Sequence, residues 1–378
     1  MRITRLRLYN FRNIGELDLP LGPGATLFSG KNGQGKTNIL EAIYFLAYGR
    51  SFRTATPRDC VRHGRTECRI EGVVERGTLE RTLGVTIRGA EKTLSLHGKP
   101  APLEEFVGNL HLLAFTHAHL DIVRGGPADR RAFLDRAMVP LYPGHIRLLA
   151  HYGRALKQRN RVLATLGAGT RPADARLLES WDDALVGAGA RILANRLGYV
   201  ARMKSRLPEG LFGVETLRMH YLSTIGAEDP DRAVLEGLFR RGLERARARD
   251  LKTGTTTVGP HRDELKLYVN GKGLGACGSA GQQRSGRLAL YFSQMEIHAE
   301  AHGFYPVFLV DDAEAELDQE RLHTFLAYLS ERTQTVLTSA RDFLVPSPGL
   351  DPVRFVVENG TVRTPGAETG SPTPAMPT

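Results

Sequence analysis

An eight-residue stretch rich in glycine constrains this chain more than any other feature. Residues 30–37 read GKNGQGKT and match the phosphate-binding pattern G-x-x-x-x-G-K-[ST]. The apolar run at 25–28 precedes this stretch as a short buried strand would, and residues 38–47 follow it with apolar side chains at helical spacing. We therefore predict a strand, a phosphate-cradling loop and a helix, with a nucleoside triphosphate as the ligand.

Each part of this loop has an expected task. Glycines allow successive backbone N–H groups to turn toward phosphate oxygens, and the N-terminus of the next helix adds positive charge. Lys36 is expected to reach the β- and γ-phosphates of ATP, and the Thr37 hydroxyl is expected to hold Mg²⁺. The predicted nucleotide-binding residues of the loop are Gly30, Lys31, Asn32, Gly33, Gln34, Gly35, Lys36, Thr37 and Asn38.

An apolar strand that ends in two acids would complete such a site. Residues 307–310 read VFLV and are followed by Asp311 and Asp312. We expect Asp311 to support Mg²⁺ from the end of the strand. Asp312 is expected to polarise the attacking water as the general base, so that Asp312 and Lys36 are the predicted catalytic residues.

A second anion-binding turn is predicted at 279–284, which read SAGQQR before a helix. Ser, Gly and Gln at a helix start present N–H groups to an anion. Ser279 as a simple N-cap explains the local sequence equally well, so both interpretations stay open. Because the chain already carries one phosphate loop, a second cradle suggests two chains that share nucleotide between them.

Composition limits the classes of partner. The formal net charge of +10 fits a partner with a phosphate backbone, although a solvated basic surface would explain it as well. No apolar run approaches the ~18 residues of a membrane span. The three cysteines show no C-x-x-C spacing, and the first residues alternate as a strand does rather than as a signal peptide does. We therefore expect a cytoplasmic protein.

The apolar spacing changes twice along the chain. β-rich runs with glycine-containing turns fill the first hundred residues, helical spacing follows, and alternation returns after residue 252. The predicted fold is α/β: a split head at 1–115 and 250–365, with an antiparallel β subdomain, and a mainly helical inserted lobe at 116–249. The small, Pro-rich residues at 366–378 predict a disordered tail.

Other candidate sites have weaker support. The run 117–119, HAH, has the spacing of a metal pair but no cysteine or acidic partner. His261 in the run GPHRD could be a base, but the Gly-Pro start favours a turn, with positioning or interface roles for Arg262 and Asp263. The arginine-rich end of the predicted helix at 232–249 is either a solvated face or a DNA-facing one.

The ensemble of motifs resembles a known family. The phosphate loop, the S-x-G-Q turn, the acid-ended strand and the run ELD at 316–318 together resemble an ABC-type ATPase of the DNA-repair branch. Further segments narrow this to the RecF family, over residues 1 to about 363, because transporter ATPases lack the last three of them. These segments are LYNFRN at 8–13, GPADRRAFLD at 126–135, LKQRN at 156–160 and GPHRD at 259–263.

The resemblance implies an ABC-type head with a Rad50/SMC-like core and a second lobe without a long coiled coil. It implies a weak, DNA-stimulated ATPase that dimerises with ATP on single-stranded DNA, duplex DNA or gap junctions. Such a protein works with RecO and RecR to place RecA at single-strand gaps, in DNA repair, replication and the SOS response. Ser279, Gly281 and Gln282 would then contact the γ-phosphate of the other chain's nucleotide, and Asp318 would lie at the dimer seam.

The chain departs from the wider ABC pattern at two positions, which favours slow hydrolysis. Asp312 stands where such ATPases generally carry Glu, and Ser339 stands near where many carry His. The glutamine of the Q-loop has no clear match, and residues 115–117 are the best candidate. Two other functions remain open. The first is a transporter-type ATPase subunit, which the positive net charge of the chain disfavours. The second is an SMC-like structural clamp, which would need sustained heptads that the region 130–249 lacks.

Overall fold

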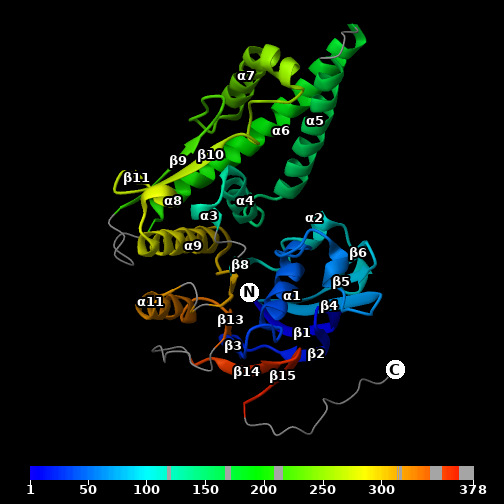
Figure 1. Ribbon diagram of the computed structural model, residues 1–378, viewed down its shortest axis with the longest axis vertical. Coiled ribbons are helices and arrows are strands. Elements are labelled where there is room, and N and C mark those ends of the chain that lie inside the picture. Colours follow the sequence, from blue (N-terminus) through cyan, green and yellow to red (C-terminus); the bar gives the residue numbers. More distant parts are fainter. Residues whose placement is uncertain are drawn as a thin grey trace. The chain divides into compact units, whose positions relative to one another are not determined.

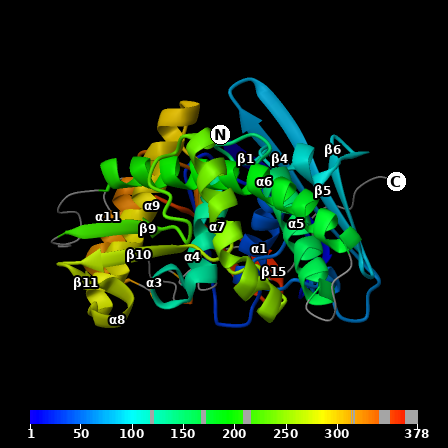
Figure 2. The ribbon, with the colours of Figure 1, turned by 90° about the horizontal axis from the view of Figure 1, so that it is seen from above.

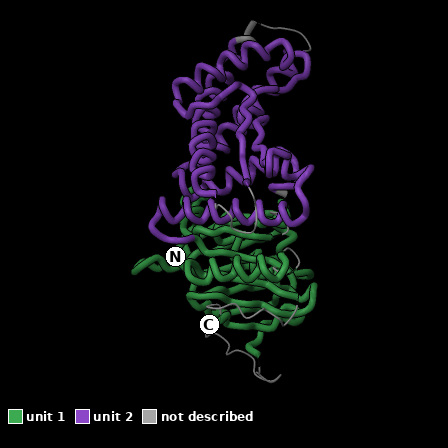
Figure 3. The backbone as a smooth tube through the Cα atoms, turned by 90° about the vertical axis from the view of Figure 1, so that its left-hand side faces the viewer, with its two compact units in different colours: residues 1–117, 306–378 green, residues 118–305 purple. Residues whose placement is uncertain are grey.

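The computed structural model describes residues 1–116, 121–166, 172–207, 216–312, 314, 317–340 and 351–365. The chain divides into two compact units, residues 1–117 with 306–378 and residues 118–305 (Figure 3). The run 117–119 and the predicted disordered tail at 366–378 lie outside the described residues. No described helix combines the length and the apolar character that a membrane crossing requires.

The first sheet of unit 1 is antiparallel, as the alternating runs predicted (Figure 1). Its strands in spatial order are β2 (Ile14–Pro20), β1 (Arg2–Phe11), β4 (Glu67–Arg76), β5 (Leu79–Arg88), β6 (Glu91–Leu96) and β7 (Lys99–Pro100). Alternate residues of β5, such as Leu83, Val85 and Ile87, are buried, because successive side chains point to opposite faces of a sheet. The short helices η1 (Pro57–Cys60) and α2 (Leu103–Phe106) lie in the connections.

The second sheet of unit 1 carries the strand that leads into the phosphate loop. Its spatial order is β15 (Thr361–Arg363), β14 (Val353–Glu358), β3 (Ala25–Ser29), β13 (Thr335–Ser339), β12 (Val307–Val310) and β8 (Leu112–Phe115). All of these run parallel except β15, and every residue of β3, β12 and β13 is buried. Because the carboxyl ends of parallel strands share one edge, the residues that follow β3, β12 and β13 come together there.

Helix α1 (Lys36–Tyr48) packs against strands of both sheets (Figure 1). Ten of its 13 residues are buried, which matches a helix that is apolar on nearly every side. Its side chains join one core cluster with residues of both sheets, such as Ile70 of β4 and Leu309 of β12. This packing holds the start of α1 at the edge where the parallel strands end. A further helix, α11 (Gln319–Ser330), connects β12 to β13.

Unit 2 contains three long helices that lie side by side (Figures 1 and 2). They are α5 (His145–Leu166), α6 (Pro172–Ser205) and α7 (Arg232–Thr253). Tyr152, Leu185 and Phe239 are buried where these helices meet. The other helices described in unit 2 are the short α3 (Asp121–Arg124), α4 (Pro127–Met138) and α8 (Leu274–Cys277) and the long α9 (Ala280–His302). The helical spacing of this region predicted its main content correctly.

The second domain boundary lies near residue 305 rather than at the predicted position of 250. The first two strands after residue 252 do not join a sheet of unit 1: β10 (Glu264–Val269) pairs with β9 (Leu217–Leu222) and β11 (Lys272–Gly273) within unit 2. Leu265 is fully buried there among side chains of α4 and α6. Alternation predicts that a strand exists, but it does not identify the sheet that the strand joins.

Candidate nucleotide-binding site

The loop between β3 and α1 needs glycine at the positions where the backbone turns. Gly30, Gly33 and Gly35 have φ angles of 145°, 82° and 114°, in the region that other residues rarely adopt. Space adds a second reason, because a Cβ atom on Gly30 would lie 2.3 Å from the carbonyl oxygen of Val357, and one on Gly35 would lie 2.7 Å from Asn13 Oδ1. The predicted phosphate loop therefore has the backbone form that the motif requires.

Two turns from distant parts of unit 1 brace the loop at Gln34. Its carbonyl oxygen accepts hydrogen bonds from Asn13 Nδ2 at 3.0 Å and from the N–H of Gly360 at 2.9 Å. Its side-chain Oε1 accepts from the N–H of Asn359 at 2.6 Å. Asn38 is tied to the same arrangement, because its Nδ2 donates to Asn13 Oδ1 at 2.8 Å. The Asn-Gly turn at 359–360 was predictable as a hairpin, but its support of the loop was not.

The Lys36 ammonium lies inside the loop. Its Nζ donates to the carbonyl oxygens of Gly30 at 2.5 Å and Lys31 at 2.9 Å, and the residue is only 6% exposed. This burial lowers the pKa of Lys36. Three carboxylates oppose the effect by favouring the charged form, those of Asp312, Glu314 and Asp311. The site thus gathers one cation and three acids around the space next to the loop.

Asp311 joins the loop to the acid-ended strand. Its Oδ1 accepts hydrogen bonds from Thr37 Oγ1 at 2.9 Å and from Thr338 Oγ1 at 2.7 Å. Its N–H donates to the carbonyl oxygen of Phe115, and the residue is buried. The two predicted Mg²⁺ ligands, Thr37 and Asp311, therefore lie in direct contact. A hydroxyl and a carboxylate are the hard oxygen ligands that Mg²⁺ prefers in proteins, so the residues fit the ion.

Asp312 adopts an unusual backbone conformation at the end of β12. Its φ angle is 50°, in the left-handed region, and its N–H donates to Thr338 Oγ1 at 2.8 Å. The Thr338 hydroxyl thus accepts from one acid's backbone and donates to the other acid's carboxylate. Thr338 was not among the site residues predicted from the sequence, because its position there indicates only a buried strand.

Glu314 is a second functional candidate that sequence analysis missed. Its Oε1 accepts hydrogen bonds from Ser339 Oγ at 2.6 Å and from the N–H of Ala340 at 2.7 Å. Ser339 is the residue that stands near the usual ABC histidine, so its hydroxyl is already bonded to an acid. The available signal was a further acid two positions after Asp312.

A buried ion pair supports the start of α1. Glu41 is 0% exposed and accepts from Arg12 Nε at 3.0 Å and Arg12 Nη2 at 2.5 Å. Arg53 Nη1 lies 3.4 Å from the same carboxylate and donates to Asn38 Oδ1 at 2.8 Å. Arg12 belongs to the segment LYNFRN and directly follows β1, so this segment contacts the helix after the loop.

The second predicted anion turn lies in unit 2 and has the geometry of an N-cap. The exposed Ser279 accepts a hydrogen bond at Oγ from the N–H of Gln282 at 3.2 Å, and its own N–H donates to Gln282 Oε1 at 2.9 Å. This capping box starts α9. Gly281 follows within the first turn of that helix. A contact of these residues with a second chain's nucleotide stays a prediction.

Two other expectations concern unit 1. Asp318, expected at a dimer seam, is the N-cap of α11 and accepts from the N–H of Arg321 at 3.0 Å. Its neighbour Glu316 lies outside the described residues. Of the candidate Q-loop, Phe115 ends β8 and Thr116 is buried, whereas His117 is not described.

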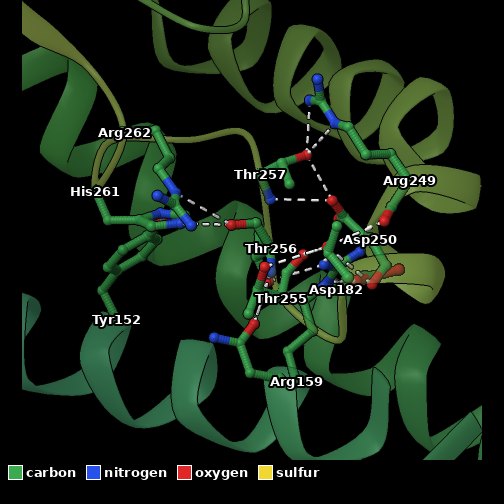
Figure 4. A network of polar contacts seen from close by, with 12 residues as sticks. Tyr152, Arg159, Asp182, Arg249, Asp250, Thr255, Thr256, Thr257, His261 and Arg262 are labelled. Atoms are coloured by element: carbon green, nitrogen blue, oxygen red, sulfur yellow. Dashed lines mark hydrogen bonds and ion pairs between the residues drawn. The ribbon is translucent and has the colours of Figure 1, made fainter. Parts of the chain in front are cut away.

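His261 of the run GPHRD is a partly buried side chain of unit 2 whose two ring nitrogens both have partners within the lobe (Figure 4). Its ring bonds the Tyr152 hydroxyl at Nδ1 (2.6 Å) and the carbonyl oxygen of Thr256 at Nε2 (3.1 Å). Burial lowers the pKa of His261 to about 4. The neighbouring Asp263 accepts from the N–H of Thr224 at 2.7 Å. These residues hold the fold of the lobe together.

The chain is similar to the RecF/RecN/SMC N terminal domain over residues 2–347. A DNA replication and repair protein RecF from Myxococcus xanthus is 35% identical over 370 residues, which are 95% of this chain and 96% of that protein. Its counterpart from Listeria welshimeri is 32% identical over 372 residues, 96% of this chain and 100% of that one.

Solved structures agree with this similarity. The structure described as "recombination mediator protein RecF-ATPrS in RecFOR pathway" matches with a TM-score of 0.87 at 27% identity and covers 97% of this chain and 98% of that one. An Smc head domain derived from Pyrococcus furiosus matches with a TM-score of 0.54 at 16% identity, covering 96% and 95%, and this likeness concerns the fold alone. The fold is that of an ABC-type ATPase head with an inserted, mainly helical lobe.

Proposed function

This chain belongs to the RecF family, and from that premise we propose that it is an ATP-dependent DNA-binding protein of replication and recombinational repair. ATP would act as a switch that closes a dimer on DNA, and slow, DNA-stimulated hydrolysis would reset it. The observation that carries the proposal is the hydrogen bond of 2.9 Å between Thr37 and Asp311, which joins the phosphate loop to the acid-ended strand.

The charges of the site support Mg²⁺–ATP as the ligand. One ammonium, that of Lys36, faces the carboxylates of Asp311, Asp312 and Glu314. A triphosphate brings further negative charge, so binding next to these acids requires an additional cation. Thr37 and Asp311 would hold Mg²⁺, and the bound ion would neutralise negative charge on the phosphate oxygens. Backbone N–H groups of the loop and of the first turn of α1 would bind the phosphates.

We expect hydrolysis to be slow. Asp312 would act as the general base, but its carboxylate is one methylene shorter than the glutamate that such ATPases generally carry at this position. The hydroxyl of Ser339 already donates to Glu314, so it must change partner before it can contact a phosphate. Both features favour a protein that holds ATP for long periods, as a switch requires.

A shared nucleotide would link ATP to dimerisation. Ser279, Gly281 and Gln282 would contact the γ-phosphate bound by a second copy of the chain, so hydrolysis would remove the contact that holds the dimer. The partners proposed on this basis are DNA, RecO and RecR, and indirectly RecA, in the cytoplasm. The solved relative described as belonging to the RecFOR pathway supports these partners by similarity.

Sedimentation with and without Mg²⁺–ATP tests the proposal, with gapped duplex DNA in a parallel run. We expect the mass to double with ATP and the DNA to sediment with the protein. Lys36→Ala should fail to bind ATP, and Ser279→Arg should bind ATP yet stay monomeric. Ser279→Thr keeps the capping hydroxyl and is the control for Ser279→Arg. A parent protein that stays monomeric and ignores DNA would contradict the switch, and a Ser279→Arg dimer would contradict the shared site.

A further inference from the structure

Five of the six arginines of α7 fall into two groups. Arg232 and Arg240 are paired, because Arg232 Nε lies 2.7 Å from Glu236 and Arg240 Nη1 lies 2.6 Å from Asp183 of α6. The second group, Arg241, Arg245 and Arg249, is spaced four residues apart and therefore follows one face of the helix. Neither Arg241 nor Arg245 forms an ion pair or hydrogen bond with another described residue.

These three arginines, which we call the arginine row, line a surface cavity of about 540 Å³ in unit 2. The cavity is lined by Thr224, Ile225, Gly226, Leu238, Arg241, Gly242, Arg245, Ala246, Arg249 and Val258. Among the described residues, this lining contains three cations, no acid and no aromatic side chain. The exposed guanidinium groups thus stand over buried apolar residues, Ala246 and Val258, without a compensating charge in the cavity.

A buried network holds the end of the arginine row in place (Figure 4). The Arg249 guanidinium donates to Thr257 Oγ1 from Nε at 2.9 Å and from Nη2 at 2.7 Å. The Thr257 hydroxyl donates in turn to Asp250 Oδ1 at 2.6 Å, and Asp250 Oδ2 accepts from Arg159 Nη1 at 2.8 Å. Arg159 and Asp250 are both 0% exposed. The exposed Arg249 is thereby connected through Thr257 to the buried pair of Arg159 and Asp250.

The same network fixes the elements around the cavity. Arg159 of α5 also donates to Asp182 of α6 at 2.5 Å and to Thr256 Oγ1 at 2.9 Å. The Thr256 hydroxyl donates to Asn160 Oδ1 at 2.7 Å. These bonds tie α5, α6, α7 and the segment after α7 to one another, and that segment supplies Val258 to the cavity lining. A binding surface held rigid in this way loses little conformational entropy when a ligand docks.

We propose that the arginine row binds the phosphate backbone of duplex DNA. Eight helical residues span about 12 Å, the axial length of three or four phosphates on one strand at about 3.4 Å each. The described part of the lining lacks the aromatic anchors on which single-stranded bases stack and which are enriched at protein–protein interfaces. The proposal rests on the proposed function for the presence of DNA and adds a surface at which the DNA is contacted.

The test is the salt dependence of duplex binding by Arg241→Ala/Arg245→Ala, measured by fluorescence anisotropy with a duplex of about 30 base pairs. Each lost phosphate contact should reduce the slope of log K against log salt by about 0.9. The loss of two contacts should therefore reduce the slope by about 1.8. Between about 50 and 200 mM salt, the fold-loss of affinity should then be about 12 times smaller in the variant than in the parent protein. Arg241→Lys/Arg245→Lys should restore most of the slope, since lysine also neutralises phosphate.

Arg232→Ala/Arg240→Ala is the matched control, because it removes the same charge from paired arginines of the same helix. Its slope should stay close to that of the parent protein. Equal slopes for the two double variants, with the parent binding the duplex, would overturn the proposal and leave the arginine row to an acidic protein partner. ATP affinity measured in parallel should be unchanged in both variants. A parent protein that binds ATP but no duplex would refute the DNA part of the proposed function itself.

Discussion

His261 can gain a proton only by disrupting the hydrogen bonds of its ring. A carbonyl oxygen only accepts, so Nε2 must donate to Thr256, and Nδ1 must then accept from the Tyr152 hydroxyl. Protonation of Nδ1 would leave the Tyr152 hydroxyl proton without its acceptor in a buried site. Burial, which disfavours the charged ring, lowers the pKa of His261 to about 4 in the folded protein, although the bond to Thr256 opposes this shift.

The sign and size of the effect follow from linkage. An unfolded histidine has a pKa of about 6.5, so between about pH 6.5 and 4 the unfolded state binds more protons than the folded one. Stability is therefore fully present above about pH 6.5 and falls as the pH drops. With a folded pKa of about 4, His261 removes about 2 kcal/mol from the free energy of unfolding of unit 2 between pH 7 and 5.

Urea unfolding of the parent and of His261→Gln at about pH 7 and pH 5 measures this loss. Glutamine also offers one acceptor and one donor but does not titrate, so the variant should lack the drop of about 2 kcal/mol. Trp181, the chain's one tryptophan, packs between the helices of unit 2 and reports its unfolding by fluorescence. The raised pKa of Asp263 acts in the opposite direction in both proteins and cancels in the comparison. An equal pH dependence in the two proteins would refute the reasoning.

Two further predictions concern unit 1. Arg12→Met should destabilise the unit by about 3–5 kcal/mol in urea unfolding, because Glu41 would stay buried with its main partner removed. Arg2→Met, which breaks an exposed pair with Glu75, is the control and should cost less than about 1 kcal/mol; a similar loss in both variants would contradict the first estimate. Asp312→Asn should bind ATP and dimerise but hydrolyse it about 100-fold more slowly in a phosphate-release assay, and unchanged turnover would place the base elsewhere.

Local patterns predicted most of the elements. The phosphate loop was identifiable because its glycines, Lys36 and Thr37 act through spacing within eight residues. The Asn-Gly sequences at 270–271 and 359–360 are typical of hairpin turns for a similar reason: Asn270 and Asn359 both have φ angles of 50°, each followed by a glycine of positive φ. Such features need no knowledge of what packs against them.

Contacts between distant segments were not predictable in the same way. Thr338 holds both Asp311 and Asp312, but its position in the sequence gives only a buried strand. Glu314 bonds a residue 25 positions later, across a helix. The domain boundary was misplaced because the alternating apolar pattern around Leu265 would suit a strand in the sheet of either unit. In each case the missing information is which segment lies beside which.

The position of β3 has a consequence for how the protein is made. This strand is synthesised early, yet it pairs on one side with β13 and on the other with β14, which follow it by about three hundred residues. In an emerging chain the phosphate-loop strand therefore keeps at least one edge unpaired until translation has passed residue 356, and unit 2 can fold first. Chains that stop earlier keep an open, apolar strand and a loop without its Gly360 brace, which makes them substrates for chaperones and proteases rather than competitors for ATP.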